Sequence, residues 1–305
     1  MVDRAFGFAS FSCYNRVGTA SRHTHSLDSE ANMKITCIVD DRTHSDSALR
    51  AEHGASFLIE TGTHTVLFDT GQSGEVLLHN LEALGISLQQ IEALILSHAH
   101  NDHTGGLPAL LDHVQGIPLY AHPDLFRKRF RRTDTGPRLV GPSMTRKALA
   151  CKVNLKLHAE PVEVVPGVWT TGDIGARSEP EGRGPHHFVR QGAGWIEDPY
   201  RDDLSVVLET EKGLGLLCGC CHAGLLNTLA HVRTTFGRDP SVVMGGLHLL
   251  NADAPTLDHV IETLQGYGPP RLWVGHCTGD RSFLRLKAAF GEQVSLYHVG
   301  IELTI

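Results

Sequence analysis

The chain has 305 residues, of which 41% are hydrophobic and 20% are charged, and its formal net charge is −7. This balance is typical of a globular protein and excludes a largely disordered chain. The acidic net charge argues against a general nucleic-acid-binding surface. Because no run of about 18 apolar residues occurs, we expect no transmembrane helix.

The predicted elements start after a polar stretch, residues 1–32, which we expect to be an N-terminal extension. A buried strand is predicted at 33–39, and two further strands at 55–60 and 65–69 flank a short turn, which is a hairpin signal. The elements that follow are a helix at 75–84, a strand at 91–96, a helix at 106–114, a strand at 118–121 and a helix at 124–132.

The segment from about 132 to 201 is rich in Gly, Pro and charged residues, so we expect strands joined by long loops, as an insertion or a lid. Regular spacing then returns. The predicted elements are strands at 204–209 and 213–218, a helix at 225–236, a strand at 241–244, a helix at 254–264, a strand at 271–274, a helix at 281–290 and a strand at 294–299. Hairpins followed by alternating strands and helices predict an α/β domain over 33–305, in which helices cover sheets.

Histidine is unusually frequent, with 20 copies, and four ligand-type side chains lie in His98-Ala99-His100-Asn101-Asp102-His103. This stretch follows a predicted strand and precedes a predicted helix. In extended backbone, residues two apart face the same side, so His98, His100 and Asp102 can converge, while His103 can serve a second metal. Imidazole and carboxylate groups bind zinc, iron or manganese. Gly105 and Gly106 are expected to allow a tight turn and to leave room over the ions.

The pattern His98-x-His100-x-Asp102-His103 resembles the signature of the metallo-β-lactamase superfamily, and the resemblance extends from about Met33 to the C-terminus. It implies a four-layer αβ/βα sandwich with metals at one edge, between the sheets. It also implies that Asp69 anchors a metal ligand without binding metal itself. The later histidines that match the family pattern are His222, in Gly-Cys-Cys-His-Ala-Gly, and His276, in Val-Gly-His-Cys-Thr-Gly.

The resemblance implies two divalent metal ions, which we expect to be zinc, with manganese or iron as alternatives. The ligands implied for one ion are His98, His100 and His222, and those for the other are Asp102, His103 and His276. Three protein ligands leave open positions for water, as in catalytic sites. A metal lowers the pKa of bound water to roughly 7, so hydroxide becomes available for attack. Asp102 could also hold the nucleophilic water, which would make it a catalytic residue.

One departure from the family pattern concerns the strand before His276, where many two-metal members carry an aspartate that bridges the ions. Residues 242–249 read Val-Val-Met-Gly-Gly-Leu-His-Leu, without an aspartate, which leaves the number and identity of the metals open. His248 lies in this stretch and is predicted to donate a proton or bind substrate if it is not a ligand. His53 is a candidate for substrate binding, with a helix-cap or core position as the alternative.

The stretches 52–60, 219–224, 245–249 and 275–279 further resemble a subgroup that contains dihydropterin ribofuranosyl-aminobenzene phosphate synthases and metal-dependent hydrolases. We therefore expect a metal-dependent hydrolase that acts on a small, anionic ester or phosphoester. The alternative is a pterin-related synthase that performs a condensation at the same metal site. An iron dioxygenase is a weaker alternative, because that class normally keeps the missing aspartate.

Several further predictions concern the surroundings of the site and the partners of the protein. Five cations in residues 126–132 form either a solvated helix face or an anion-attracting rim beside the site. The expected partner is a small anionic molecule, with no membrane; nucleic acid is a disfavoured alternative, and a homo-oligomer stays open. Seven cysteines without a paired framework favour a reducing, cytoplasmic location. Cys221 is expected to be a strand-end thiol near the site.

Overall fold

The computed structural model describes residues 32–184 and 186–305, so the predicted extension at 1–32 lies outside the described residues except for Asn32. Two seven-stranded sheets form the centre of the domain. The first sheet has the strand order β18 (Glu302–Thr304), β1 (Lys34–Val39), β2 (Ser56–Glu60), β3 (Thr65–Phe68), β4 (Ala93–Ile95), β5 (Pro118–Ala121), β8 (Asn154–Leu157). The second has the order β17 (Val294–Leu296), β16 (Arg271–Val274), β15 (Pro240–Gly245), β14 (Gly213–Cys218), β13 (Ser205–Thr210), β10 (Val168–Thr170), β9 (Val162–Val165).

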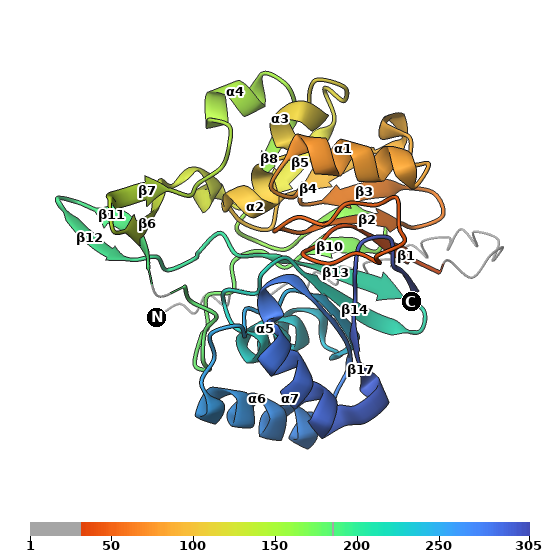
Figure 1. Cartoon of the computed structure of the whole chain (residues 1–305), viewed down its shortest axis with the longest axis vertical. Helices are drawn as coiled ribbons and strands as arrows, with labels where there is room; N and C mark the ends of the chain where they lie inside the picture. The colour runs from red at the N-terminus through yellow and green to blue at the C-terminus, as the bar shows by residue number, and fades with distance from the viewer. Residues whose placement is uncertain (1–31, 185) are drawn as a thin grey trace, which may run out of the picture. The chain divides into compact units, whose positions relative to one another are not determined.

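Helices cover the outer face of each sheet, which gives the predicted four-layer αβ/βα sandwich (Figure 1). The helices are α1 (Gly74–Ala83), α2 (Asn101–Thr104), α3 (Leu107–Leu110) and α4 (Arg146–Ala150) in the half with the first sheet, and α5 (Leu225–Phe236), α6 (Ala254–Tyr267) and α7 (Asp280–Phe290) in the half with the second. Short 3₁₀ turns complete the set: η1 (Leu88–Gln90), η2 (Pro123–Phe126), η3 (His276–Thr278) and η4 (Gly291–Gln293). No helix in the described part of the chain is long and apolar enough to cross a membrane.

Alternation along the strands builds the layers. In β2, Phe57 and Ile59 pack into the core between the two sheets, whereas Leu58 points to the opposite core under α1 and α3. In β14, Leu217 enters the core between the sheets, and Leu216 packs beneath the helices of the second half. Because successive strand residues face opposite sides, a strand buried on both faces must be apolar throughout. The continuous apolar runs of the sequence therefore describe sheets that are covered on both faces.

A third sheet of four strands has the order β12 (Gly194–Glu197), β11 (His187–Gln191), β6 (Arg129–Thr133), β7 (Gly136–Leu139). It lies to one side of the sandwich in Figure 1. Residues 132–201, which were expected to hold strands joined by long loops, supply most of this sheet as well as β8, β9 and β10 of the two large sheets.

The predicted helix at 124–132 is wrong, because the chain forms the turn η2 and then strand β6. The physical reason is Arg129, whose side chain is buried between two carboxylates that follow strand β12. Its Nε lies 2.8 Å from Asp198 Oδ2, and its Nη2 lies 2.5 Å from Asp202 Oδ1. Burying a charge requires such partners, and here they fix the strand.

Smaller differences concern element ends. The helix predicted at 106–114 is the four-residue α3, followed by turns. The strand predicted at 294–299 ends at Leu296, and the last strand is the unpredicted β18, which pairs with β1 at the edge of the first sheet.

Candidate metal centre

The six predicted ligands all follow strands at one edge of the sandwich. His98 follows β4, the next three begin α2 or lie in it, His222 follows β14, and His276 follows β16. β3 and β4 run parallel, as do β14, β15 and β16. The carboxyl ends of parallel strands meet at the same edge, and this explains how residues far apart in sequence converge.

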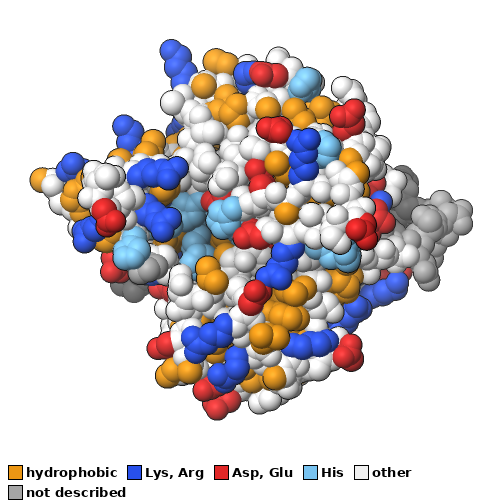
Figure 2. Space-filling view, in the orientation of Figure 1, with side chains coloured by type: hydrophobic (Ala, Val, Ile, Leu, Met, Phe, Trp, Pro, Cys, Tyr) orange, Lys and Arg blue, Asp and Glu red, His pale blue; other side chains and the backbone are white. Residues whose placement is uncertain are grey.

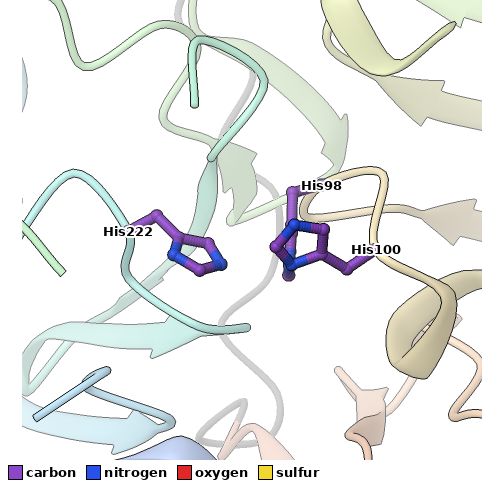
Figure 3. Close-up of side chains that lie close together, drawn as sticks. All are labelled: His98, His100 and His222. Atoms are coloured by element: carbon purple, nitrogen blue, oxygen red, sulfur yellow. The ribbon is translucent and has the colours of Figure 1, made fainter. Parts of the chain in front are cut away.

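The first predicted ligand set forms a compact group. The candidate ligand atoms of His98, His100 and His222 lie within 4.8 Å of one another. Figure 3 shows the three side chains close together, with His98 and His100 on one loop and His222 on another. Burial lowers the pKa of each of these imidazoles well below the ordinary 6.5, so all three are neutral at pH 7. Neutral rings have free nitrogen lone pairs, which metal binding requires.

The second predicted set, Asp102, His103 and His276, forms another group with ligand atoms within 4.8 Å. Asp102 Oδ2 lies 3.7 Å from Nε2 of His103 and 3.5 Å from Nε2 of His276. Burial opposes ionisation of Asp102, but the neighbouring histidines outweigh it and hold the pKa well below 3.8. Asp102 is therefore an ionised carboxylate that faces two imidazole nitrogens.

Asp69 lies where the predicted anchor role requires it. Its Oδ2 is 2.6 Å from Ser97 Oγ and 2.7 Å from His103 Nδ1, and both donate to it because a carboxylate only accepts. The Ser97 oxygen is in turn 2.8 Å from Nδ1 of His98 and accepts from it. Asp69 thus orients one histidine of each group, directly or through Ser97, so that Nε2 of each ring carries the lone pair.

The last two histidines are anchored in the same way. His222 Nδ1 donates to the carbonyl of Gly182 at 2.7 Å, and His276 Nδ1 donates to Asp41 Oδ1 at 2.8 Å. Sequence reasoning missed Asp41. The available signal was its place two residues after the end of β1, at the edge where the other strand ends carry candidate ligands.

Two consecutive acids, also missed, brace the ligand loops. Asp202 Oδ2 accepts from the backbone N–H of Ala99 at 2.8 Å, and Asp203 Oδ2 accepts from that of Ala223 at 2.9 Å. Since Asp202 also binds Arg129, the small sheet is tied directly to the loop between His98 and His100.

The donor set fits a metal centre. Among the described residues, Nε2 of His100, of His222 and of His276 are buried without a hydrogen-bond partner. Leaving a buried polar atom unsatisfied costs about 1–3 kcal/mol, and a bound cation would remove that cost. Imidazole and carboxylate ligands suit zinc, manganese and iron.

Backbone strain is concentrated around this centre. Among the described non-glycine residues, positive φ angles occur at Asp69, Tyr200, Cys221, His248 and His276. Each such residue costs about 1–3 kcal/mol and persists only where its surroundings fix it. Asp69 is a proposed anchor, His276 is a proposed ligand, and His248 lines the cleft described next. Cys221 precedes His222 in sequence, and Tyr200 stacks on the His222 ring.

A cleft of about 340 Å³ lies over the two groups, at the lower end of the range for small-molecule sites. Arg131 of β6 and Arg138 of β7 line it from the small sheet and face each other across the hairpin. Both side chains are exposed, and neither has an ion-pair partner in the described part of the chain. Figure 2 shows histidine side chains gathered in a hollow, with Lys and Arg side chains beside it. Of the five cations at 126–132, Arg131 lines the cleft, and it does so from a strand rather than from a helix.

Both predicted substrate-binding histidines line this cleft. His248 lies 4.2 Å from His222 between ring centroids, and burial together with the charge of His276 lowers its pKa to about 4. A neutral His248 can exchange hydrogen bonds with a substrate. His53 is at the rim, with Nδ1 3.1 Å from Asp41 Oδ2 and Nε2 3.4 Å from Asp102 Oδ2.

The segment 132–201 also contributes side chains that had no sequence motif. Tyr200 stacks on His222, with centroids 4.0 Å apart and planes 12° apart. Its hydroxyl lies 2.7 Å from Nδ1 of His187, and His187 lines the cleft. These residues fix the position of the His222 ring.

Two expectations about neighbouring residues change. Cys221 points away from the centre, with its sulfur 3.3 Å from Thr228 Oγ1, and the thiol that faces the histidines belongs to Cys220, 3.1 Å from His103 Nε2. Gly105 has an ordinary helical φ of −69°. A Cβ there would lie 2.0 Å from the carbonyl oxygen of Gln72, so this glycine permits close packing of two loops rather than room over ions.

Comparison with known proteins places the fold. Residues 49–206 match the family model described as Metallo-beta-lactamase superfamily. The chain belongs to the metallo-beta-lactamase superfamily. This confirms the resemblance found in the sequence and the sandwich fold that it implied.

Relatives within the superfamily differ in activity. The chain is 29% identical over 289 residues to 7,8-dihydropterin-6-methyl-4-(beta-D-ribofuranosyl)-aminobenzene-5'-phosphate synthase of Methanocaldococcus jannaschii, covering 88% of this chain and 95% of that protein. It is 25% identical to the crystal structure of Tm1679, a metal-dependent hydrolase of the superfamily, with a TM-score of 0.77 over 90% of this chain and 99% of that one. Zn(2+)-bound PqqB of Methylobacterium extorquens, 13% identical with a TM-score of 0.58 over 89% of this chain and 100% of that one, shares the fold.

Proposed function

We propose that this protein is a metal-dependent hydrolase that acts on a small anionic ester or phosphoester. The observation that carries the proposal is the pair of ligand groups at the base of a cleft, with three buried imidazole nitrogens that lack a partner among the described residues. Similarity to the metal-dependent hydrolase Tm1679 supports this class of activity.

The groups would hold two divalent ions, with zinc expected and manganese or iron as alternatives. Bound ions would supply a water of lowered pKa as the nucleophile. The protein side chains around the ions have other roles. Asp102, ionised and only 18% exposed, can accept a hydrogen bond and orient a water molecule. Arg131 and Arg138 can attract the anionic group, and His248 and His53, which line the same cleft, can contact it.

A second candidate is a condensing synthase on a pterin-type substrate at the same centre. The observation that favours it is the similarity to the Methanocaldococcus jannaschii synthase over 88% of this chain. The name of that relative contains an aminobenzene 5'-phosphate, so the cationic rim suits either candidate.

The test begins with protein purified without added metal, followed by elemental analysis and assays after reloading with zinc, manganese or iron. We expect about two ions per chain and turnover of a phosphoester or carboxylic ester that disappears on chelation. Turnover of a pterin diphosphate with an aminobenzene phosphate, and of no ester, would favour the synthase. A chain that binds no divalent ion would overturn both.

A further inference from the structure

Residues 242–249 carry no aspartate that could bridge the two ligand groups, and the structure shows what lies beside this stretch. The loop after β15 begins with Gly245 and Gly246. A Cβ at Gly246 would lie 2.6 Å from Cys277 Sγ and 3.4 Å from His276 Cδ2. The Cys277 sulfur and the Gly219 carbonyl oxygen, which is also 2.6 Å from that Cβ, leave no space there for a side chain as large as aspartate.

Cys220 lies between the two groups. Its sulfur shares one cluster with His98 and His103 and another with His276 and Cys277, with ligand atoms within 4.8 Å in each. His98 belongs to the first ligand group, whereas His103 and His276 belong to the second. Cys220 is thus close to ligands of both groups, as a bridging ligand must be.

The hydrogen bonds around Cys220 favour the same role. His103 donates through Nδ1 to Asp69, so its Nε2 carries a lone pair that accepts from the Cys220 thiol at 3.1 Å. The thiol proton thus lies between two atoms that both bind cations. Cys220 is buried, with 3% of its surface exposed, and it lines the cleft over the two groups.

Cys277 is engaged differently. Its sulfur accepts from the backbone N–H of His248 at 3.3 Å and donates to the carbonyl of Cys220 at 3.6 Å. Both hydrogen-bonding roles of this thiol are therefore satisfied by backbone groups. It is the natural comparison for Cys220, since it is also buried and its sulfur lies within 4.8 Å of the same His276 ligand atom.

We propose that Cys220 is a metal ligand shared by the two groups and takes the role of the missing bridging carboxylate. This inference rests on the proposed metal-dependent function. On binding, the S–H bond breaks, the proton passes to solvent, and the thiolate bonds to the cation, so no oxidant or reductant is needed. A thiolate ligand favours zinc over manganese.

The test is titration of the metal-free full chain with cobalt(II), followed by absorption spectroscopy. We expect visible ligand-field bands together with a near-ultraviolet band from sulfur-to-cobalt charge transfer. Cys220→Ser should lose the charge-transfer band and keep the ligand-field bands. It should also bind one of the two ions at least about tenfold more weakly. Cys277→Ser should keep the charge-transfer band.

A charge-transfer band that survives in Cys220→Ser and disappears in Cys277→Ser would overturn the inference. Ligand-field bands without charge transfer in the natural sequence would also overturn it, while leaving the metal centre and the proposed function intact. Absence of cobalt binding would instead contradict the proposed function. Should Cys220→Ser fail to fold, X-ray absorption of the zinc-loaded natural protein decides, with sulfur expected at about 2.3 Å from zinc.

Discussion

Asp41 Oδ1 lies 2.8 Å from Nδ1 of His276, so the loop after the first strand holds a proposed ligand that follows β16, far along the chain. The same carboxylate contacts His53 at the rim of the cleft. The hydrogen bonds from His276 and His53 outweigh the opposing effect of burial and hold the pKa of Asp41 below its usual range. Asp41 is therefore charged at neutral pH and fixes which nitrogen of His276 faces the centre.

We predict that Asp41→Ala weakens binding of one divalent ion by about 10- to 100-fold, because His276 loses its orienting partner. Competition with a chromogenic chelator measures this change. Asp46→Ala is the matched control, since Asp46 lies in the same loop and its side chain bonds only Ser45 among the residues that the structure describes. Equal metal affinity in both variants would show that Asp41 does not support the centre.

Replacing His100 or His276 by Ala is predicted to remove metal and reduce turnover to background, while the fold is kept. Each variant deletes one member of a three-residue ligand group. Elemental analysis, turnover and circular dichroism are the measurements, with the exposed His113→Ala as control. Full metal content and full rate in His100→Ala would refute the ligand assignment.

The cationic rim is predicted to act on substrate binding. The double variant Arg131→Ala with Arg138→Ala should raise KM for an anionic substrate about tenfold with little change in kcat, because two exposed charge contacts together contribute roughly 1.4 kcal/mol. Arg132→Ala is the control, since Arg132 lies next in β6 but stacks on Phe188, 4.6 Å from the ring centroid. If the control raises KM as strongly, the effect is general charge rather than the cleft.

Stability of the metal-free protein should depend on pH through its buried histidines. Burial depresses the pKa of His98, His100 and His222, and that of His248 to about 4. Below pH 6.5 the unfolded chain binds protons that the folded chain refuses. The free energy of unfolding therefore falls as pH falls, by up to about 1.4 kcal/mol per pH unit for each histidine.

His276 acts in the opposite sense. Burial lowers its pKa, but Cys277, Asp102 and Asp41 outweigh that effect and raise it well above 6.5. Its contribution is thus fully present below pH 6.5 and is lost as pH rises through the folded pKa. Urea unfolding of the chelator-treated protein at several pH values measures both pH dependences of the free energy of unfolding. His248→Gln should reduce the change in the free energy of unfolding between pH 6.5 and 4, whereas His113→Gln should not. A free energy of unfolding that does not vary with pH would contradict the prediction.

The sequence-based predictions succeed where information is local. The strand before His98 and the strand ends before His222 and His276 all lie within short windows, and the order of strands and helices predicted sheets covered by helices. The four-layer sandwich was predicted from the family resemblance. The helix predicted at 124–132 failed because Arg129 takes its partners from Asp198 and Asp202, about 70 residues away, and no local pattern shows that.

The thiol near the centre shows the same limit at finer scale. Cys220 and Cys221 are adjacent, and only the backbone decides which faces the ligands. A φ of +58° at Cys221 directs its side chain toward Thr228, which leaves Cys220 with the histidines. Positive φ at a non-glycine residue is imposed by tertiary packing, so the sequence alone could not distinguish the two.

The small sheet of β6, β7, β11 and β12 has a further consequence. Among the described residues it contributes Arg131, Thr133, Arg138 and His187 to the cleft but none of the six proposed ligands. Evolution could therefore change cleft-lining residues of this sheet such as Arg131 and Arg138 without replacing a ligand, whereas Arg129 and His187 support the ligand loops through Asp202 and Tyr200. Such modularity would let one scaffold acquire new substrates while its chemistry stays constant.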